Sequence, residues 1–207
     1  MFTGIIEKIG TIQSTSEENY GKSLKVKCTP WDTPIQRGES IALSGCCLTV
    51  TNHEIEGDRL FLSFDVIPET LNVTTLGSWV EGECVNIERA VTAETPLGGH
   101  LVQGHVDYLS SLNEIKKVNG DYVLVFSLTT DMKYKIVEKG CIAINGVSLT
   151  VSSLDANAFE VSLIPETLKM TNLKLLKVGN AVNIETDVMT RSIYSIVQKV
   201  LATKQQV

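Results

Sequence analysis

Two side chains in this sequence combine reactive chemistry with a favourable local setting. Cys47 follows Cys46 in a β-rich run, where its thiolate could act as a nucleophile or a hydrogen-bonding ligand. A small buried hydrophobic role is the alternative for Cys47. Because neighbouring strand residues point to opposite faces, Cys46 is predicted to lie in the core. His105 follows Gly104, where a backbone can approach a ligand, so its imidazole is a candidate acid or base or, alternatively, structural.

Three other charged side chains could support chemistry. Lys139 could supply positive charge near an anionic intermediate, or it could be a solvated surface lysine. Glu69 and Glu166 could be paired carboxylates, but their identical Pro-Glu-Thr-Leu contexts favour a role at helix starts. The five cysteines have no C-x-x-C spacing and there are three histidines, so no metal site is predicted.

These candidates lie within an internal repeat. Residues 38–50 (GESIALSGCCLTV) and 139–151 (KGCIAINGVSLTV) agree at six of thirteen positions. The segment Ile67–Leu71 recurs unchanged at 164–168, and Val85–Glu88 recurs at 182–185. The matched segments are 97 to 101 residues apart, and a repeat of this length indicates two tandem copies of a whole domain. Equivalent positions that differ mark separate roles for the copies, and these are Cys47/Ser148, Ser40/Cys141 and Ile5/His105, whereas Thr49/Thr150 is kept.

Each copy has the pattern of β structure. Loose alternation over 59–66 and 121–128 predicts strands, and the runs 40–43 and 46–50 predict a pair of strands joined at a glycine. Pro68 and its twin predict short helices. Several short strands in under 100 residues favour a closed barrel, so an all-β fold of two tandem barrels is predicted. The turn cluster Pro96–Gly99 marks the expected boundary between them.

The last segment has no counterpart in the first copy. From Asp187 to Gln206 the apolar residues recur at helical spacing, and Asp187 or Thr190 could cap the start. The apolar residues are Met189, Ile193, Ile196, Val197, Val200 and Leu201. Such a helix could pack on its own barrel or pair with copies of itself in an oligomer. The sequence leaves both alternatives open.

Composition narrows the class of protein. Apolar residues are 43% and charged residues 20%, which is typical of a globular chain. A net charge of −6 without a basic stripe disfavours nucleic acid as a partner. The chain has no apolar run of membrane-spanning length and no signal-peptide pattern. An odd number of cysteines, two of them adjacent, favours reduced thiols in a cytoplasmic protein.

Several motifs together closely resemble the riboflavin synthase family of the alpha-chain type. They are Met1–Glu7, Ser44–Val50, both Pro-Glu-Thr-Leu stretches, Gly98–His105 and Asn145–Val151. The resemblance covers essentially the whole chain, in order. It implies two six-stranded Greek-key barrels, 1–97 and 98–186, and an oligomerisation helix, 187–207, in a homotrimer.

The resemblance also implies an activity. The family is a group of transferases that dismutate two molecules of 6,7-dimethyl-8-ribityllumazine without cofactor or metal. A four-carbon unit passes from one molecule to the other, giving riboflavin and 5-amino-6-(D-ribitylamino)uracil. Two identical substrates need two similar pockets, which a duplicated domain supplies. In the family the pockets meet between the first barrel of one subunit and the second barrel of the next; association with a lumazine synthase shell stays open.

The resemblance further implies the site residues. The first-barrel pocket would involve Gly4, Ile5, Ile6, Cys47, Leu48, Thr49, Asp65, Val66, Ile67, Pro68, Glu69 and Thr70. The second-barrel pocket would involve Gly104, His105, Val106, Lys139, Ser148, Leu149, Thr150, Ser162, Leu163, Ile164, Pro165, Glu166 and Thr167. Phe2, Ser40, Cys47 and His105 match positions linked to turnover. Where the family pattern has an aspartate this chain has Asn145, which cannot act as a general base.

Two other functions fit parts of this pattern. One is a non-catalytic lumazine- or flavin-binding protein of the same fold, such as a bioluminescence antenna protein. Those relatives lack the second pocket and the segment equivalent to Gly98–His105, which this chain keeps. The other is the flavin-binding barrel of a reductase, which is disfavoured because no nicotinamide-binding half follows.

Overall fold

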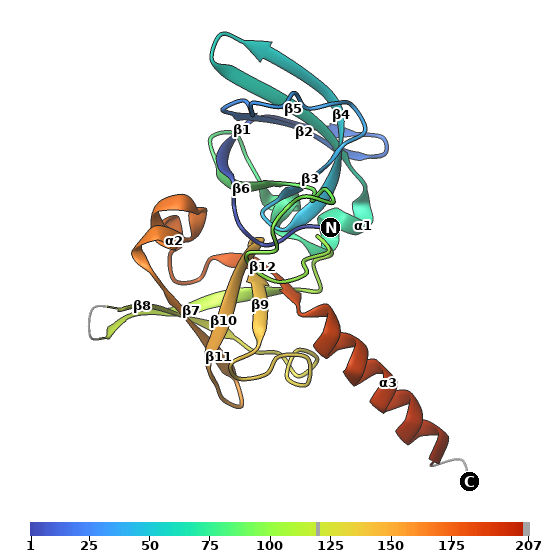
Figure 1. Cartoon of the computed structure of the whole chain (residues 1–207), viewed down its shortest axis with the longest axis vertical. Coiled ribbons are helices and arrows are strands. Elements are labelled where there is room, and N and C mark those ends of the chain that lie inside the picture. The colour runs from blue at the N-terminus through green and yellow to red at the C-terminus, as the bar shows by residue number, and fades with distance from the viewer. Residues whose placement is uncertain (119–120, 205–207) are drawn as a thin grey trace.

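The computed structural model describes residues 1–118 and 121–204. They form two closed six-stranded antiparallel barrels, and a long C-terminal helix extends from the second barrel (Figure 1). This confirms the predicted fold class. None of the helices in these two ranges is long and apolar enough to cross a membrane.

The first barrel closes through pairing of its first and last strands. Its strands are β1 Lys8–Glu18, β2 Gly21–Cys28, β3 Ser40–Leu43, β4 Cys46–Glu56, β5 Arg59–Val66 and β6 Cys84–Arg89. Around the barrel they run β1-β2-β5-β4-β3-β6, so three hairpin-connected strands are followed by one that returns beside the first of them. This is a Greek-key arrangement, and closure leaves no unpaired sheet edge.

The second barrel repeats this topology. Its strands are β7 Tyr108–Val118, β8 Asp121–Ser127, β9 Cys141–Ile144, β10 Val147–Leu154, β11 Ala158–Leu163 and β12 Ala181–Thr186. Each barrel also carries a short helix and a 3₁₀ turn before its last strand: α1 Pro68–Val73 with η1 Thr75–Ser78, and α2 Pro165–Met170 with η2 Asn172–Leu175. Both helices begin at the proline that the sequence indicated, because proline suits the first helical turn.

Alternation along the strands separates the core from the outer face. On β4 the side chains of Cys46, Leu48 and Val50 are buried inside the first barrel, whereas Cys47 and Thr49 point outward. Burial raises the pKa of the Cys46 thiol to about 12, so it stays protonated and inert. The prediction that Cys46 belongs to the core is confirmed.

The two barrels meet through turns and asparagines that repeat in both copies. A Cβ atom on Gly45 would lie 2.6 Å from the Gly146 nitrogen, so only glycine permits this approach. Asn86 donates from Nδ2 to the Asn145 carbonyl at 2.9 Å, and Asn183 donates to the Ser44 carbonyl at 2.8 Å. These reciprocal bonds give the repeated Val-Asn-Ile-Glu motif a structural purpose.

Asn145 occupies a turn that requires a left-handed backbone. Its φ is +47°, a conformation that asparagine and aspartate tolerate better than most residues. Its Oδ1 accepts the Asn183 N–H at 2.9 Å. Its carbonyl accepts the Asn86 amide of the other barrel, so the residue serves the contact between the barrels.

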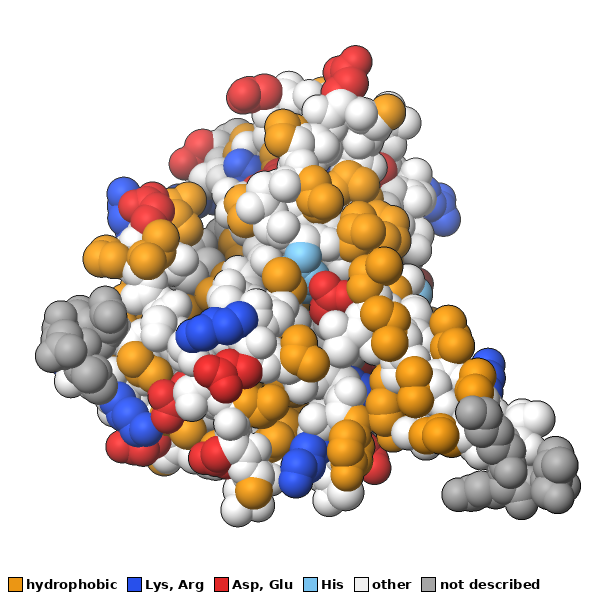
Figure 2. Space-filling model, turned by 60° about the horizontal axis from the view of Figure 1, so that its bottom comes forward, with side chains coloured by type: hydrophobic (Ala, Val, Ile, Leu, Met, Phe, Trp, Pro, Cys, Tyr) orange, Lys and Arg blue, Asp and Glu red, His pale blue; other side chains and the backbone are white. Residues whose placement is uncertain are grey.

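The C-terminal helix α3, Val188–Lys204, does not cover its own barrel. Asp187 caps it, since its Oδ1 accepts the N–H groups of Met189 and Thr190 at 2.6 and 3.1 Å. The helix points away from both barrels (Figure 1), and hydrophobic side chains gather along its length (Figure 2). The six apolar residues of the predicted stripe are between 46% and 63% exposed. Packing on its own barrel is thereby excluded for this stripe.

Candidate functional site

The segment that opens each repeat crosses to the other barrel. The carbonyl of Gly4 accepts the Ser148 N–H at 2.8 Å, and the carbonyl of Gly104 accepts the Cys47 N–H at 2.8 Å. Between these crossings Phe2 and Val102 exchange two backbone hydrogen bonds of 2.7 and 3.1 Å. Each barrel therefore presents an outer face completed by the other repeat.

This crossing brings together residues that the resemblance places in different pockets. Gly104, His105 and Val106 lie against the first barrel, and Val106 packs on its core. Gly4 and its neighbours lie against the second barrel, and Ile6 belongs to the core of that barrel. These two segments therefore contact the barrel opposite to the one with which the resemblance groups them, and the pocket that each serves stays a prediction. Cys47 and His105, assigned to different pockets, share one face.

The face on the first barrel gathers several predicted residues. Ser40 pairs with Thr49 across β3 and β4, and Cys47 is half-buried two residues away on the same outer face. A Cβ atom on Gly104 would lie 2.5 Å from the Cys47 Cβ and 2.9 Å from the Phe2 ring, and its φ is +81°. Phe2 is fully buried behind this contact. We therefore place Phe2 as a support of the face rather than as part of its surface.

The equivalent face on the second barrel contains the matching set. Cys141 pairs with Thr150 across β9 and β10, and Ser148 is half-buried on the same outer side. Ile5 is exposed beside it. Lys139 has a φ of +64°, whereas its twin Gly38 has the φ of +92° that glycine accepts readily. A lysine held in this conformation costs roughly 1–2 kcal/mol.

Not every predicted site residue presents its side chain on these faces. Those of Ile6, Leu48, Val66 and Leu163 are buried inside the barrels, so only their backbone could contact a ligand. Those of Asp65, Ile67, Pro68, Glu69, Ser162, Ile164, Pro165 and Glu166 are exposed, and those of Thr70, Leu149 and Thr167 are partly exposed. Glu69 and Glu166 lie in the first turns of α1 and α2, on different barrels (Figure 1), so they form no carboxylate pair.

His100 is a candidate site residue that the sequence did not predict. Its Nδ1 lies 2.7 Å from the Ser148 Oγ, and its Nε2 is buried with no hydrogen-bond partner in the part of the chain that the structure describes. Burial lowers the pKa of His100, which favours the neutral imidazole. The signal was weak because His100 precedes the repeat and would correspond to a position before Met1. The second-barrel face thus has a histidine–serine pair where the first has Cys47 and His105.

Two buried carboxylates hold the crossing segments. Glu88 accepts the Thr3 N–H at 2.6 Å and the Gly4 N–H at 3.0 Å. Glu185 accepts the N–H groups of Gln103, Gly104 and His105 at 2.6, 2.9 and 2.9 Å. Burial raises the pKa of both carboxyl groups, although the hydrogen bonds favour their charged forms. Glu88 and Glu185 end the two copies of the repeated Val-Asn-Ile-Glu segment, and this repetition is the sequence feature that indicates them.

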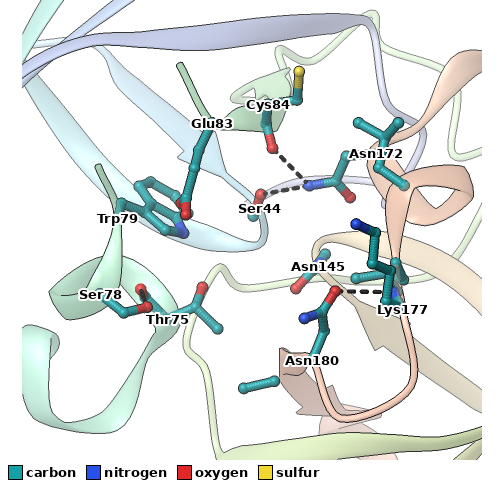
Figure 3. A pocket seen from close by; sticks show the side chains of 13 residues that line it. Ser44, Thr75, Ser78, Trp79, Glu83, Cys84, Asn145, Asn172, Lys177 and Asn180 are labelled. Atoms are coloured by element: carbon teal, nitrogen blue, oxygen red, sulfur yellow. Dashed lines mark hydrogen bonds between the residues drawn. The ribbon is translucent and has the colours of Figure 1, made fainter. Parts of the chain in front are cut away.

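A separate cleft opens between the barrels (Figure 3). It has a volume of about 530 Å³, and its lining includes Ser44, Trp79, Glu83, Asn172 and Lys177. None of the residues predicted for the two pockets lines it, whereas Asn145 does. Within residues 1–118 and 121–204 no group of three or more His, Cys, Asp or Glu side chains could hold a metal ion.

Comparison with known proteins agrees with this duplicated architecture. A model of the lumazine binding domain matches the chain twice, over residues 3–90 and 103–187. The riboflavin synthase of Chlamydia pneumoniae is 41% identical over 204 residues, covering 98% of both chains. The riboflavin synthase of Bacillus subtilis (strain 168) is 35% identical over 206 residues, covering 100% of this chain and 94% of that protein.

A solved structure is similar over most of the chain. The crystal structure of LumP complexed with riboflavin has a TM-score of 0.73 and 25% identity, covering 90% of this chain and 99% of LumP. The double match to the lumazine binding domain coincides with the two barrels. Because this chain is 35% and 41% identical to these riboflavin synthases over nearly its full length, it belongs to the riboflavin synthase family.

Proposed function

We propose that this chain catalyses the riboflavin synthase reaction, in which two molecules of 6,7-dimethyl-8-ribityllumazine give riboflavin and 5-amino-6-(D-ribitylamino)uracil. The observation that supports it best is the pair of similar faces with different polar groups. Cys47 and His105 share one face, whereas His100 and Ser148 share the other. A dismutation needs two copies of one substrate in two different roles, and this asymmetry can supply them.

The reaction must remove a proton from the C7 methyl group of one lumazine. That carbon is acidic because its anion delocalises into the ring. An imidazole titrates near neutral pH and can accept the proton directly or through a water molecule. We assign this task to His105, whose side chain is exposed on the first-barrel face. Holding two substrates face to face would supply much of the remaining rate enhancement.

We further propose a homotrimer in which the first barrel of one subunit faces the second barrel of the next. The exposed apolar stripe of α3 supports self-association, since such a large contiguous apolar surface is rare on a monomer. Three exposed isoleucines would be covered by a substrate or a neighbouring subunit: Ile5 beside Ser148, and Ile67 and Ile164 at the starts of α1 and α2. All five cysteines are free thiols, which supports a reducing, cytoplasmic location.

A non-catalytic binding function is less well supported. LumP is only 24–25% identical to this chain, whereas the riboflavin synthases named above are 35% and 41% identical over nearly its full length. Incubation with 6,7-dimethyl-8-ribityllumazine alone distinguishes the riboflavin synthase reaction from non-catalytic binding. Appearance of riboflavin fluorescence, with one riboflavin formed for two lumazines consumed, is the expected result. Tight binding without turnover would favour the non-catalytic function.

The first variant to examine is Cys47→Ser. The Cys47 side chain lies outside the barrel core, so the fold should be retained. We expect kcat/KM to fall about tenfold or more, a loss of about 1.4 kcal/mol of transition-state stabilisation. Steady-state kinetics would measure this, with Cys84→Ser as a control outside the two faces. Parent-level turnover in Cys47→Ser would reduce Cys47 to a packing residue.

Lys139→Gly offers a substitution that should cost activity without costing stability. Glycine relieves a left-handed backbone strain of roughly 1–2 kcal/mol in the folded state. It also increases the entropy of the unfolded chain, which lowers the free energy of unfolding by about 0.4–1 kcal/mol. We therefore expect the free energy of unfolding to stay level or rise slightly, while turnover falls with the loss of the ammonium group. Lys139→Asn also tolerates this backbone and should match it. If both variants keep the parent kcat and KM, Lys139 is a solvated surface residue.

A further inference from the structure

The turn that carries His105 is held from two sides. The Glu185 carboxylate accepts three consecutive backbone N–H groups, including that of His105. The Arg191 guanidinium of α3 donates to the Gln103 Oε1 and to the Asp107 Oδ1. Gln103 and Asp107 lie two residues before and two residues after His105. Arg191 therefore clamps both flanks of the turn.

The acceptor side of this clamp is itself fixed. The second carboxylate oxygen of Asp107 accepts the Thr186 N–H at 2.9 Å and the Thr186 hydroxyl at 2.7 Å. Thr186 is the last residue of β12, immediately before the cap of α3. The Arg191 and Asp107 side chains are only 24% and 15% exposed, so solvent screens the pair less than a surface ion pair. The position of the Arg191–Asp107 pair is thus set by the junction between β12 and α3.

The first repeat holds its equivalent turn without α3. Glu7, the counterpart of Asp107, accepts the Trp31 Nε1–H and the Arg89 backbone N–H, both from the first barrel. Thr3, the counterpart of Gln103, donates its hydroxyl to Glu88 at 2.7 Å. In the described part of the chain, only the histidine-bearing copy is tied to the C-terminal helix.

We propose that Arg191 is a positioning residue that fixes His105 over the first-barrel face and thereby couples the first turn of α3 to turnover. The inference rests on the proposed function, in which His105 moves the proton. Arginine suits the task because its planar fork bonds two acceptors at once, which a lysine ammonium cannot do in the same geometry. A helix that assembles subunits would in this way also order the acid–base turn.

Arg191→Gln is the first test. We expect kcat to fall about 100-fold, since a displacement of about 1 Å from the reacting atoms can cost that much. KM and the oligomeric state should be nearly unchanged, because the apolar stripe is intact. Lys199→Gln removes the same charge about two turns further along α3 and should keep parent kinetics. Parent kcat in Arg191→Gln would overturn the proposal, and so would equal losses in both variants.

Combined variants separate positioning from a general loss of structure. In a His105→Gln background, Arg191→Gln should cause no further loss of kcat, because the group it positions is already absent. Asp107→Asn should reproduce the effect of Arg191→Gln, and the double variant should be no slower than either one. Further slowing in the His105→Gln background would show that Arg191 acts elsewhere and would overturn the proposal.

A readout independent of turnover distinguishes this proposal from the proposed function. Amide hydrogen exchange over residues 103–107 should be faster in Arg191→Gln than in the parent, whereas exchange in β12 should be unchanged. If the parent protein does not convert lumazine, the proposed function fails, and the exchange result still decides whether Arg191 holds the turn. Unchanged exchange over 103–107 would overturn the clamp whatever the activity.

Discussion

Replacing His105 by glutamine is expected to slow riboflavin formation by about 100- to 10,000-fold, the usual contribution of a general acid or base. Glutamine preserves much of the size and the hydrogen-bonding capacity but cannot take up a proton at neutral pH. The Glu185 bonds to the turn use backbone N–H groups, so they survive the substitution. Since His105 and Cys47 share one face, the defect should lie in the first-barrel site.

Exchange of the C7 methyl protons into deuterated water measures the step directly. Stopped-flow exchange should slow in His105→Gln in parallel with turnover, while lumazine binding stays close to that of the parent. His53→Gln is the matched control, because His53 lies on β4 opposite Leu62 and outside the two faces. If exchange and turnover in His105→Gln both equal the parent values, His105 is structural and the acid–base assignment is wrong.

Removing the residues after Asp187 is expected to give monomers or weak assemblies with much lower activity. The deletion removes the stripe, whose side chains are 46% to 63% exposed. Full burial of a fully exposed side chain of this kind contributes about 1.5–3 kcal/mol, so each stripe residue contributes a part of that before the costs of association. The deletion also removes Arg191 and with it the clamp on the His105 turn. Sedimentation velocity and turnover should be measured over the same range of protein concentrations.

A second variant separates assembly from the clamp. Ile193→Asp with Ile196→Asp keeps the Arg191 contacts but places charge in the stripe, whose two members are 60% and 62% exposed. We expect this variant to dissociate and to regain activity only at high protein concentration, whereas Arg191→Gln should stay assembled. A truncated protein that sediments as a fully active trimer would show that α3 has no part in assembly.

The strands, the helices and the duplication can be predicted from the amino-acid sequence. Alternating residues such as those of β4 and β5 specify strands, and Pro68 and Pro165 specify helix starts, because these signals act over a few residues. The recurrence of Val-Asn-Ile-Glu and Pro-Glu-Thr-Leu showed two copies of one domain. The apolar spacing after Asp187 predicted α3, and the motifs at Met1–Glu7 and Gly98–His105 pointed to the family.

Which barrel each crossing segment contacts becomes visible only in three dimensions. The bonds from Cys47 to Gly104 and from Ser148 to Gly4 join different repeats, and no local pattern encodes a contact across so many residues. Alternation places Cys47 on an outer face but leaves undetermined what lies against that face. For the same reason His100 beside Ser148 and Arg191 beside Asp107 became visible only in three dimensions. Local propensity selects elements, whereas the packing of one closed barrel against another selects their neighbours.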